Sequence, residues 1–353
     1  MFRCLELGRK GFPSASPNPA VGCVIEYRGE VIAEGYTQAF GGPHAEVMAL
    51  NQVKQPELLP ESTLYVSLEP CSHFGKTPPC VDRIIASGIK QVVIGILDPN
   101  PKVGGTGIEK LMAAGCSVQI GVLDQEIRKD LRFFLSSQER KRPYTILKWA
   151  ESRDGFLAPL GDNRSEKAPV WISNTAARQR VHQWRTEVQA ILVGWKTAVQ
   201  DAAQLTVRDW EGASPHRILI DPSLQTPLDA PIFNSKAPTT VFLKNETEAE
   251  KLKEIHPHVH VEQIEKEKDS VLLQLMAYLH QIQCNSLLVE GGAVSLQGFI
   301  NEDLWDEMWV VQGPALFKEG IPAPKPSGTL FSTERILDNQ IRYYHHPTNP
   351  YYI

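Results

Sequence analysis

Four residues near the start of the chain have the types and the spacing of a catalytic metal site. His44 and Glu46 are separated by one residue, and Cys71 follows a proline and precedes Cys80 by eight intervening residues. One imidazole and two thiolates can hold zinc and leave its fourth position open, as a catalytic zinc requires and a structural zinc does not. The pattern predicts a zinc site formed by His44, Cys71 and Cys80. Glu46 is placed to serve water at the open position.

This order of residues is typical of zinc-dependent deaminases, in which H-x-E is followed by P-C-x-x-C. Zinc lowers the pKa of its bound water, and Glu46 would carry protons to the ring nitrogen and to the departing ammonia. The second spacing is longer than in that signature by six residues. The intervening loop carries His73, Lys76 and Thr77, which suit an anionic substrate. The alternative is a structural zinc with His73 as its fourth ligand.

Length and composition limit the classes of protein to which the chain can belong. A length of 353 residues suits two domains, and 42% hydrophobic with 22% charged residues is typical of a globular chain. No run of 18 apolar residues is present, and the N-terminus does not resemble a signal peptide. Six cysteines in a chain of this length do not indicate a disulfide framework, so the expected location is the cytoplasm. The four cysteines outside the motif are expected to lie in the core.

The distribution of charge argues against a polymeric nucleic-acid substrate. Residues 1–143 carry 16 Lys and Arg against 15 Asp and Glu, a net charge of +1. Residues 144–353 carry 20 against 26, a net charge of −6. A nucleic-acid binder usually has a basic excess in some part of the chain, and neither half has one.

The elements that must position the motif follow from hydrophobic periodicity. A hairpin over 20–34 and a helix over 44–50 are expected to place His44 and Glu46 in a first helical turn. A strand over 63–68 leads into Cys71, a helix over 81–87 follows Cys80, and a strand over 91–97 comes next. This alternation predicts an α/β layer fold. The charged run 139–143, closed by a proline, reads as a linker.

A second alternation begins at Tyr144, with strands and helices following one another to the end of the chain. Residues 320–330, rich in Pro and Gly, are expected to form a loop. Gly291-Gly292 separate a strand over 286–289 from a helix over 293–300, an arrangement that can bind phosphate but more often reflects tight packing. No G-x-G-x-x-G motif follows a strand, so a Rossmann site is not supported.

The first half closely resembles the bifunctional deaminase–reductase family of riboflavin biosynthesis. The resemblance rests on Pro17-Asn18-Pro19, His44-Ala45-Glu46, the run from Glu69 to Cys80, and Asp98-Pro99-Asn100-Pro101. It implies a phosphorylated ribosylamino-diaminopyrimidinone substrate. It also implies a pocket lined by Asn18, His73, Lys76, Asp98 and Asn100. Family members often carry a histidine where this chain has Thr37.

The second half resembles the family's reductase domain, which is similar in fold to dihydrofolate reductase and implies NADPH. The matching runs are 147–155, 171–173, 205–208 and 289–292. The implied cofactor contacts are Glu151, Trp171, Thr197, Asp201, Gly292, Ala293, Val294, Ser295, Leu296, Gln297 and Gly298. The implied substrate contacts are Lys148, Pro169, Arg185, Leu205, Arg208 and Glu290, with the two arginines suited to the phosphate and Lys148 to charge developing at the ribose C1. Arg153 and Ala202-Ala203 depart from the family pattern, which more often has Leu and Asp-Pro.

These observations predict two α/β domains in one enzyme. Residues 1–143 are expected to form a cytidine-deaminase-like three-layer domain, and residues 144–353 a dihydrofolate-reductase-like domain. The expected function is zinc-dependent deamination followed by NADPH-dependent reduction of one small phosphorylated pyrimidine. The alternative is a nucleoside or tRNA-type zinc deaminase with a C-terminal binding module. The resemblance also implies a homo-oligomer, and no membrane partner is expected.

Overall fold

The chain folds into two compact units, seen here in a computed structural model. The structure describes residues 1–353 except 75–77, 101–103, 161–169, 266–268 and 353. One unit contains residues 1–142 together with 350–353, and the other contains residues 143–349. Among the described residues, no helix has the length and hydrophobicity needed to cross a bilayer.

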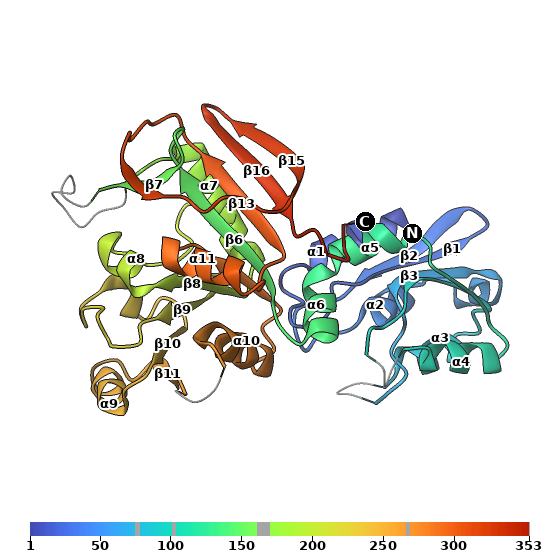
Figure 1. Cartoon of the computed structure of the whole chain (residues 1–353). Coiled ribbons are helices and arrows are strands. Elements are labelled where there is room, and N and C mark those ends of the chain that lie inside the picture. The colour runs from blue at the N-terminus through green and yellow to red at the C-terminus, as the bar shows by residue number, and fades with distance from the viewer. Residues whose placement is uncertain (75–77, 101–103, 161–169, 266–268, 353) are drawn as a thin grey trace. The chain divides into compact units, whose positions relative to one another are not determined.

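The first unit is a five-stranded sheet between helices, with strand order β2-β1-β3-β4-β5 (Figure 1). Its strands are β1 Gly22–Tyr27, β2 Glu30–Tyr36, β3 Thr63–Leu68, β4 Gln91–Ile96 and β5 Ser117–Ile120. Its helices are α1 Phe2–Gly11, α2 Ala45–Gln52, α3 Cys80–Ala86, α4 Thr106–Ala113, α5 Asp124–Asp130 and α6 Arg132–Arg140, with a 3-10 turn η1 at Pro56–Glu61. Helix α1 contacts α5, and α3 contacts both α2 and α4, so the unit has three layers.

Two features of this sheet bring the motif together. Strands β3 and β4 are parallel, so the segments that follow them leave the same edge of the sheet, where sites in α/β folds are usually built. Helix α2 packs directly on β2, because a Cβ added at Gly35 would lie 2.2 Å from the carbonyl oxygen of Ala45. The glycine therefore fixes how closely the start of α2 approaches the sheet.

The second unit contains a nine-stranded sheet of order β11-β10-β9-β8-β12-β6-β13-β16-β15 and a two-stranded sheet β14-β7. Its strands are β6 Tyr144–Glu151, β7 Phe156–Pro159, β8 Ala190–Gly194, β9 His216–Ile220, β10 Thr239–Leu243, β11 Val259–Gln263, β12 Ser286–Val289, β13 Glu307–Gln312, β14 Gly320–Pro322, β15 Thr329–Ile336 and β16 Asn339–His345. Its helices are α7 Thr175–Glu187, α8 Trp195–Gln200, α9 Glu246–Ile255, α10 Val271–Gln281 and α11 Ala293–Asn301, with a 3-10 turn η3 at Pro231–Phe233.

The hydrophobic core of the second unit lies against the central strands of the nine-stranded sheet. The strands from β11 to β13 run parallel to their neighbours, whereas β16 and β15 are antiparallel. All four residues of β12 are buried, as expected for a parallel strand covered on both faces. Leu147, Val289 and Val310 lie in one cluster of buried side chains with Leu275 and Phe299 of the covering helices.

The expected loop over 320–330 is wrong in part, because β14 and the first residues of β15 fall within it. Gly320 allows a close approach, since a Cβ there would lie 2.3 Å from the carbonyl oxygen of Ala158 on β7. Strand β15 is mostly exposed at the sheet edge and lacks hydrophobic alternation. Its pairing with β16 is therefore set by the tertiary structure rather than by a period in the sequence.

Candidate active sites

The three predicted zinc ligands meet at one point in the first unit. His44 is the residue immediately before α2, Cys71 follows β3, and Cys80 is the first residue of α3. Nδ1 of His44 lies 3.6 Å from Sγ of Cys71 and 3.4 Å from Sγ of Cys80. Tetrahedral zinc with ordinary Zn–N and Zn–S bonds separates N and S ligands by about 3.6 Å. The three side chains therefore fit zinc in position as well as in type.

The charges of the two sulfurs also call for a cation. A hydrogen bond from Cys80 lowers the pKa of Cys71, and the same contact with Cys71 raises the pKa of Cys80 well above its usual range. A bound divalent cation deprotonates coordinating thiols, so a zinc ion here would let both sulfurs act as thiolates. No other cluster of three His, Cys, Asp or Glu ligand atoms occurs in the part of the chain that the structure describes.

Glu46 lies in the first turn of α2, so its carboxylate and the His44 imidazole come from the same helix end. The side chain is 4% exposed. Burial raises the pKa of Glu46 to about 7. Glu46 is not one of the three ligand residues, which leaves its carboxylate available for proton transfer.

Removal of zinc should affect the activity of the first unit and not that of the second. We expect a strong chelator to abolish ammonia release and to leave reduction of the deaminated substrate intact, with added zinc restoring deamination. The half-buried Cys71 should then react with a chromogenic disulfide reagent, whereas the other cysteines outside the site are buried. Cys71→Ser should lack this new reactive thiol. Equal thiol reactivity before and after chelation would show that the cysteines hold no metal.

Glu69 is a residue to which the sequence assigned no role. It is 4% exposed. Its Oε2 accepts hydrogen bonds from the backbone N–H groups of Asp98 at 3.2 Å and Gly105 at 3.0 Å, and its Oε1 accepts one from Gly107 at 3.0 Å. One carboxylate therefore ties the end of β3 to the segment that follows β4 and to the first turn of α4. The sequence did place this charged residue beside the metal motif, but it did not show which groups the carboxylate binds.

Glu69→Gln tests this anchor. The amide keeps one acceptor oxygen and turns N–H groups toward backbone donors, so we expect a loss of about 1–3 kcal/mol in the free energy of unfolding. Deamination should fall because the Asp98 segment loosens, while reduction should be unaffected. Thermal unfolding and ammonia release measure the two effects. Glu57→Gln, at an exposed position of η1, is the control. Unchanged deamination in Glu69→Gln would exclude the anchoring role.

The residues expected to form the deaminase pocket are only partly placed by the structure. Asp98 is half-buried, and burial raises its pKa while the nearby His73 opposes the shift. Oδ1 of Asp98 accepts a hydrogen bond of 2.8 Å from the backbone N–H of Asn100. Asn18 lies half-buried between α1 and β1. Lys76 falls outside the described residues.

Thr37 stands where the family often has histidine. Its side chain is 3% exposed. The hydroxyl accepts a hydrogen bond of 3.1 Å from the backbone N–H of Val21, and lies 3.4 Å from the carbonyl oxygen of the same residue. In this chain the threonine therefore fixes the segment that follows Asn18.

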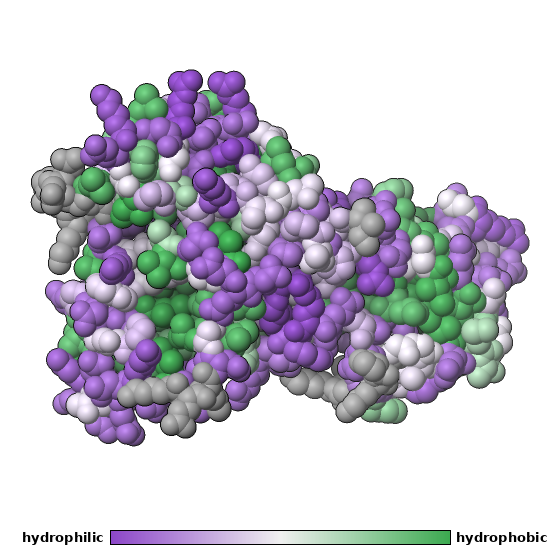
Figure 2. Space-filling view, in the orientation of Figure 1, coloured by the Kyte–Doolittle hydropathy of each residue, from purple (hydrophilic) through white to green (hydrophobic). Residues whose placement is uncertain are grey.

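The second unit contains a cavity of about 980 Å³. It is bounded by β6, α7, β8, α8, β9 and the start of α11, and this volume is at the upper end of the range for small-molecule sites. Figure 2 shows hydrophobic residues gathered over β8 and β9, with hydrophilic residues around them. The predicted residues that line the cavity are Lys148, Trp171, Arg185, Thr197, Asp201, Leu205, Arg208, Glu290, Gly292, Ala293, Val294, Ser295 and Leu296.

Four of the predicted residues are not placed in this lining. Both oxygens of the Glu151 carboxylate are engaged, Oε2 by Trp149 Nε1 at 2.9 Å and Oε1 by Arg342 Nη2 at 2.6 Å. Gln297 and Gly298 lie further along α11, and Pro169 falls outside the described residues. The Glu151 side chain is therefore held by neighbouring side chains of the same sheet.

A buried ion cluster forms the polar wall of the cavity. Arg185 donates two hydrogen bonds to Glu290, Nε to Oε1 at 2.8 Å and Nη2 to Oε2 at 2.9 Å. Nζ of Lys148 lies 3.7 Å from Oε2 of Glu290. Burial alone would raise the pKa of Glu290, but Arg185 and Lys148 lower it to about 2. Burial lowers the pKa of Lys148, and Glu290 opposes that shift.

Glycine is required where α11 begins. A Cβ added at Gly292 would lie 2.6 Å from Oγ1 of Thr197. The start of α11 and the side chain of Thr197 on α8 therefore approach each other closely within the cavity wall.

The two departures in the reductase half differ in consequence. Arg153 is exposed and lies outside the cavity lining. Ala202 has a left-handed backbone conformation with φ 44°. An aspartate, found there more often in the family, tolerates this conformation better than alanine. The alanine therefore adopts this conformation at a steric cost.

The fold and the sites define a zinc-dependent deaminase unit followed by a reductase unit on one chain. The model of the cytidine and deoxycytidylate deaminase zinc-binding region matches residues 1–96, and that of the RibD C-terminal domain matches residues 143–330. The chain belongs to the RibD family, the bifunctional deaminase–reductases of riboflavin biosynthesis. It is therefore an enzyme with both activities, dependent on zinc and NADPH, and the predicted fold class of both halves is confirmed.

Individual relatives resemble the chain along nearly its whole length. The riboflavin biosynthesis protein RibD of Aquifex aeolicus is 42% identical, covering 91% of this chain and 88% of its own. RibD of Escherichia coli is 34% identical, covering 90% and 87%. The crystal structure of the Thermotoga maritima deaminase/reductase has a TM-score of 0.86 at 35% identity, covering 98% of this chain and 97% of its own.

Proposed function

We propose that residues 1–143 deaminate 2,5-diamino-6-ribosylamino-4(3H)-pyrimidinone 5′-phosphate and that residues 144–353 reduce the product to 5-amino-6-ribitylaminouracil 5′-phosphate. The observation that carries this proposal is that each unit holds its own site, a cluster of three metal-ligand residues in the first and a cavity with a buried ion cluster in the second. The relative from Thermotoga maritima is named for both reactions. The change of unit between Arg142 and Pro143 supports the division, although residues 350–353 group with the first unit.

In the deaminase, His44, Cys71 and Cys80 hold the metal, and Glu46 moves the proton. Zinc supplies a water of lowered pKa at neutral pH. Glu46 would take up the two protons of that water one after the other, and would deliver one to the ring nitrogen and one to the leaving ammonia. Glu69 holds the Asp98 segment, and we propose that Asn18, His73, Lys76, Asp98 and Asn100 bind the substrate around it.

In the reductase, bound NADPH would supply the hydride that reduces C1 of the opened ribosylamine. Trp171, Thr197, Asp201 and the start of α11 bind the cofactor, and Lys148 faces the charge that develops near C1. Because Arg185 is held by Glu290, the charge of that arginine is compensated within the protein. Arg208 has no ion-pair partner among the described residues. We therefore propose Arg208 as the main contact of the substrate phosphate.

The combined assay supplies the diamino substrate with NADPH and follows ammonia release together with loss of the cofactor absorbance. Both signals are expected, with ammonia released first. Ammonia without NADPH oxidation would refute the reductase half of the proposal. An RNA gel shift at physiological salt tests the alternative of a tRNA-type deaminase, and no shift is expected because residues 144–353 carry a net charge of −6.

We further propose a cytoplasmic homo-oligomer. The six cysteines are all free, which supports a reducing compartment. Family resemblance supports a dimer or larger assembly, and sedimentation of the purified chain measures it. A monomer at micromolar concentration would contradict this assembly.

A further inference from the structure

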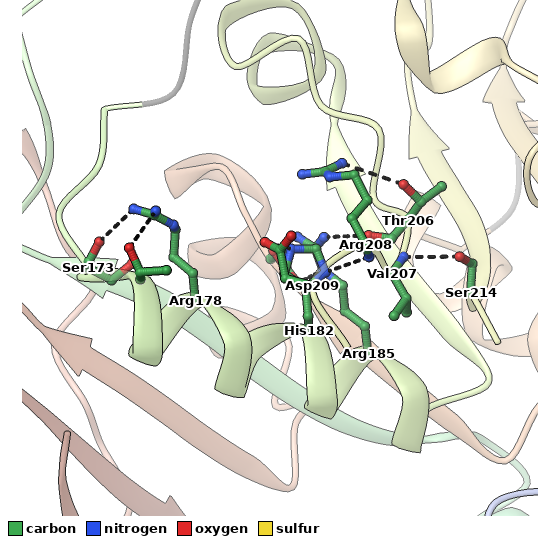
Figure 3. A network of polar contacts seen from close by, with 11 residues as sticks. Ser173, Arg178, His182, Arg185, Thr206, Val207, Arg208, Asp209 and Ser214 are labelled. Atoms are coloured by element: carbon green, nitrogen blue, oxygen red, sulfur yellow. Dashed lines mark hydrogen bonds and ion pairs between the residues drawn. The ribbon is translucent and has the colours of Figure 1, made fainter. Parts of the chain in front are cut away.

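Side chains, rather than a strand ladder, hold the backbone of residues 206–208 at the cavity wall (Figure 3). Nη1 of Arg185 donates to the carbonyl oxygen of Thr206 at 3.0 Å. The backbone N–H of Val207 donates to Oγ of Ser214 at 3.0 Å. The backbone N–H of Arg208 donates to Nδ1 of His182 at 3.2 Å. Each of three successive residues is therefore fixed by a different side chain.

The His182 contact determines the state of its imidazole. Because Nδ1 accepts a hydrogen bond, the proton of the neutral ring lies on Nε2, and Nε2 is 3.5 Å from Oδ2 of Asp209. His182 is 5% exposed. Burial, with help from Arg185 and Arg208, lowers its pKa to about 4. The ring is therefore neutral at physiological pH and remains an acceptor for the Arg208 N–H.

His182 and Arg185 act from the same face of α7. They are three residues apart and so lie side by side on the helix. The helix is itself fixed, since its N-cap Asn174 accepts a hydrogen bond from the backbone N–H of Ala177, and Arg185 is clamped by Glu290. Helix α7 thus holds the segment at two points, the carbonyl of Thr206 and the N–H of Arg208.

In contrast to its backbone, the side chain of Arg208 has few polar contacts. Its closest polar contact among the described residues is Oγ1 of Thr206 at 3.5 Å, and the residue is exposed at the cavity. The position of its guanidinium therefore depends on where the backbone of Arg208 is held. A mobile backbone would add an entropic cost to each phosphate contact.

We propose that His182 is a positioning residue of the reductase, which holds the backbone of Arg208 so that its guanidinium meets the 5′-phosphate of the substrate. This inference rests on the proposed role of Arg208 in phosphate binding. It assigns to His182 no contact with substrate or cofactor and no proton transfer.

Two amide substitutions test the inference, because they resemble different halves of the imidazole. His182→Asn places an amide oxygen near the position of Nδ1 and keeps the acceptor. His182→Gln places its amide near Nε2 and loses the acceptor. Loss of one hydrogen bond that orders a charged contact should raise KM for the deaminated substrate about tenfold in His182→Gln. His182→Asn should stay within about threefold of the parent protein, and kcat should change little in both.

Controls separate positioning from loss of structure. NADPH binding and the rate of deamination should be unchanged in both variants. Ser214→Ala removes the neighbouring anchor without touching the Arg208 N–H, and it should raise KM less than His182→Gln does. If His182→Gln does not fold, His182→Ala, which lacks the acceptor and adds no bulk, takes its place. Equal KM increases in the Asn and Gln variants would overturn the inference.

The Arg208→Ala background distinguishes this inference from the proposed function on which it rests. If both are right, Arg208→Ala raises KM strongly, and adding His182→Gln raises it no further. If Arg208→Ala leaves KM unchanged, the phosphate role of Arg208 fails, and the inference fails with it. If Arg208→Ala raises KM but His182→Gln does not, only the inference fails. An additive increase in the double variant would also exclude positioning through Arg208.

Discussion

Glu46→Gln is expected to lower the rate of ammonia release by at least about 10²–10⁴-fold, the usual contribution of a general acid–base group. The effect should be this large because Glu46 is the only group of the motif left for proton transfer once His44, Cys71 and Cys80 hold the metal. The amide has nearly the same size and cannot accept the proton. Ammonia release from the diamino substrate measures the effect.

Two observations should remain unchanged in Glu46→Gln. The zinc content should stay near one per chain, since the three ligand residues are intact, and reduction of separately supplied deaminated substrate should proceed at the parent rate. Glu109→Gln, at an exposed position of α4, is the matched control. Retention of deamination within tenfold of the parent rate would exclude Glu46 as the proton carrier. Loss of both activities would refute independent sites.

Glu290→Gln should disable the reductase and destabilise its unit. The substitution removes the negative charge that compensates Arg185 and Lys148, leaving two buried cations without a counterion. Breaking a buried pair in this way costs about 3–5 kcal/mol in the free energy of unfolding. We also expect kcat/KM for reduction to fall by about 10²-fold, because about 3 kcal/mol of the interaction that positions Arg185 and Lys148 is lost. Thermal unfolding and NADPH oxidation with deaminated substrate provide the measurements.

Glu334→Gln provides the matched comparison. Glu334 pairs with Arg180 at 3.4 Å, and both side chains are about one-third exposed. Loss of such a pair costs about 0–1 kcal/mol, so this variant should keep its stability and its activity. Deamination should be unaffected in both variants. If Glu290→Gln is as stable as Glu334→Gln, the buried cluster does not stabilise the unit.

The same cluster predicts how stability depends on pH. Arg185 and Lys148 hold the pKa of Glu290 at about 2, below its ordinary value of 4.5. The unfolded chain therefore binds this proton at a higher pH than the folded chain does. The contribution of Glu290 is fully present above pH 4.5 and is lost as pH falls from there toward 2. Unfolding measured across that range should show a smaller acid dependence in Glu290→Gln than in the parent protein.

The sequence by itself determined the metal site and the identity of the family. Zinc accepts few kinds of ligand, and the site needs its carboxylate close to the histidine, so H-x-E and the two cysteines carry the chemistry in a short pattern. The length of the loop between Cys71 and Cys80 and the motifs around it indicated a small phosphorylated substrate. The alternation of strands and helices could also be predicted, because buried parallel strands such as β8 are continuous apolar runs.

Only the tertiary structure decided which polar groups face one another. Arg185 on α7 and Glu290 after β12 are 105 residues apart, and only the fold brings their side chains into contact. The sequence assigned both arginines to the phosphate, whereas the structure pairs Arg185 with Glu290, and for that reason we propose Arg208 for the phosphate. Glu69 and His182 were not identified because their partners are backbone N–H groups. Such groups are present at nearly every residue, so they leave no pattern in the sequence until the fold brings particular ones within hydrogen-bonding distance.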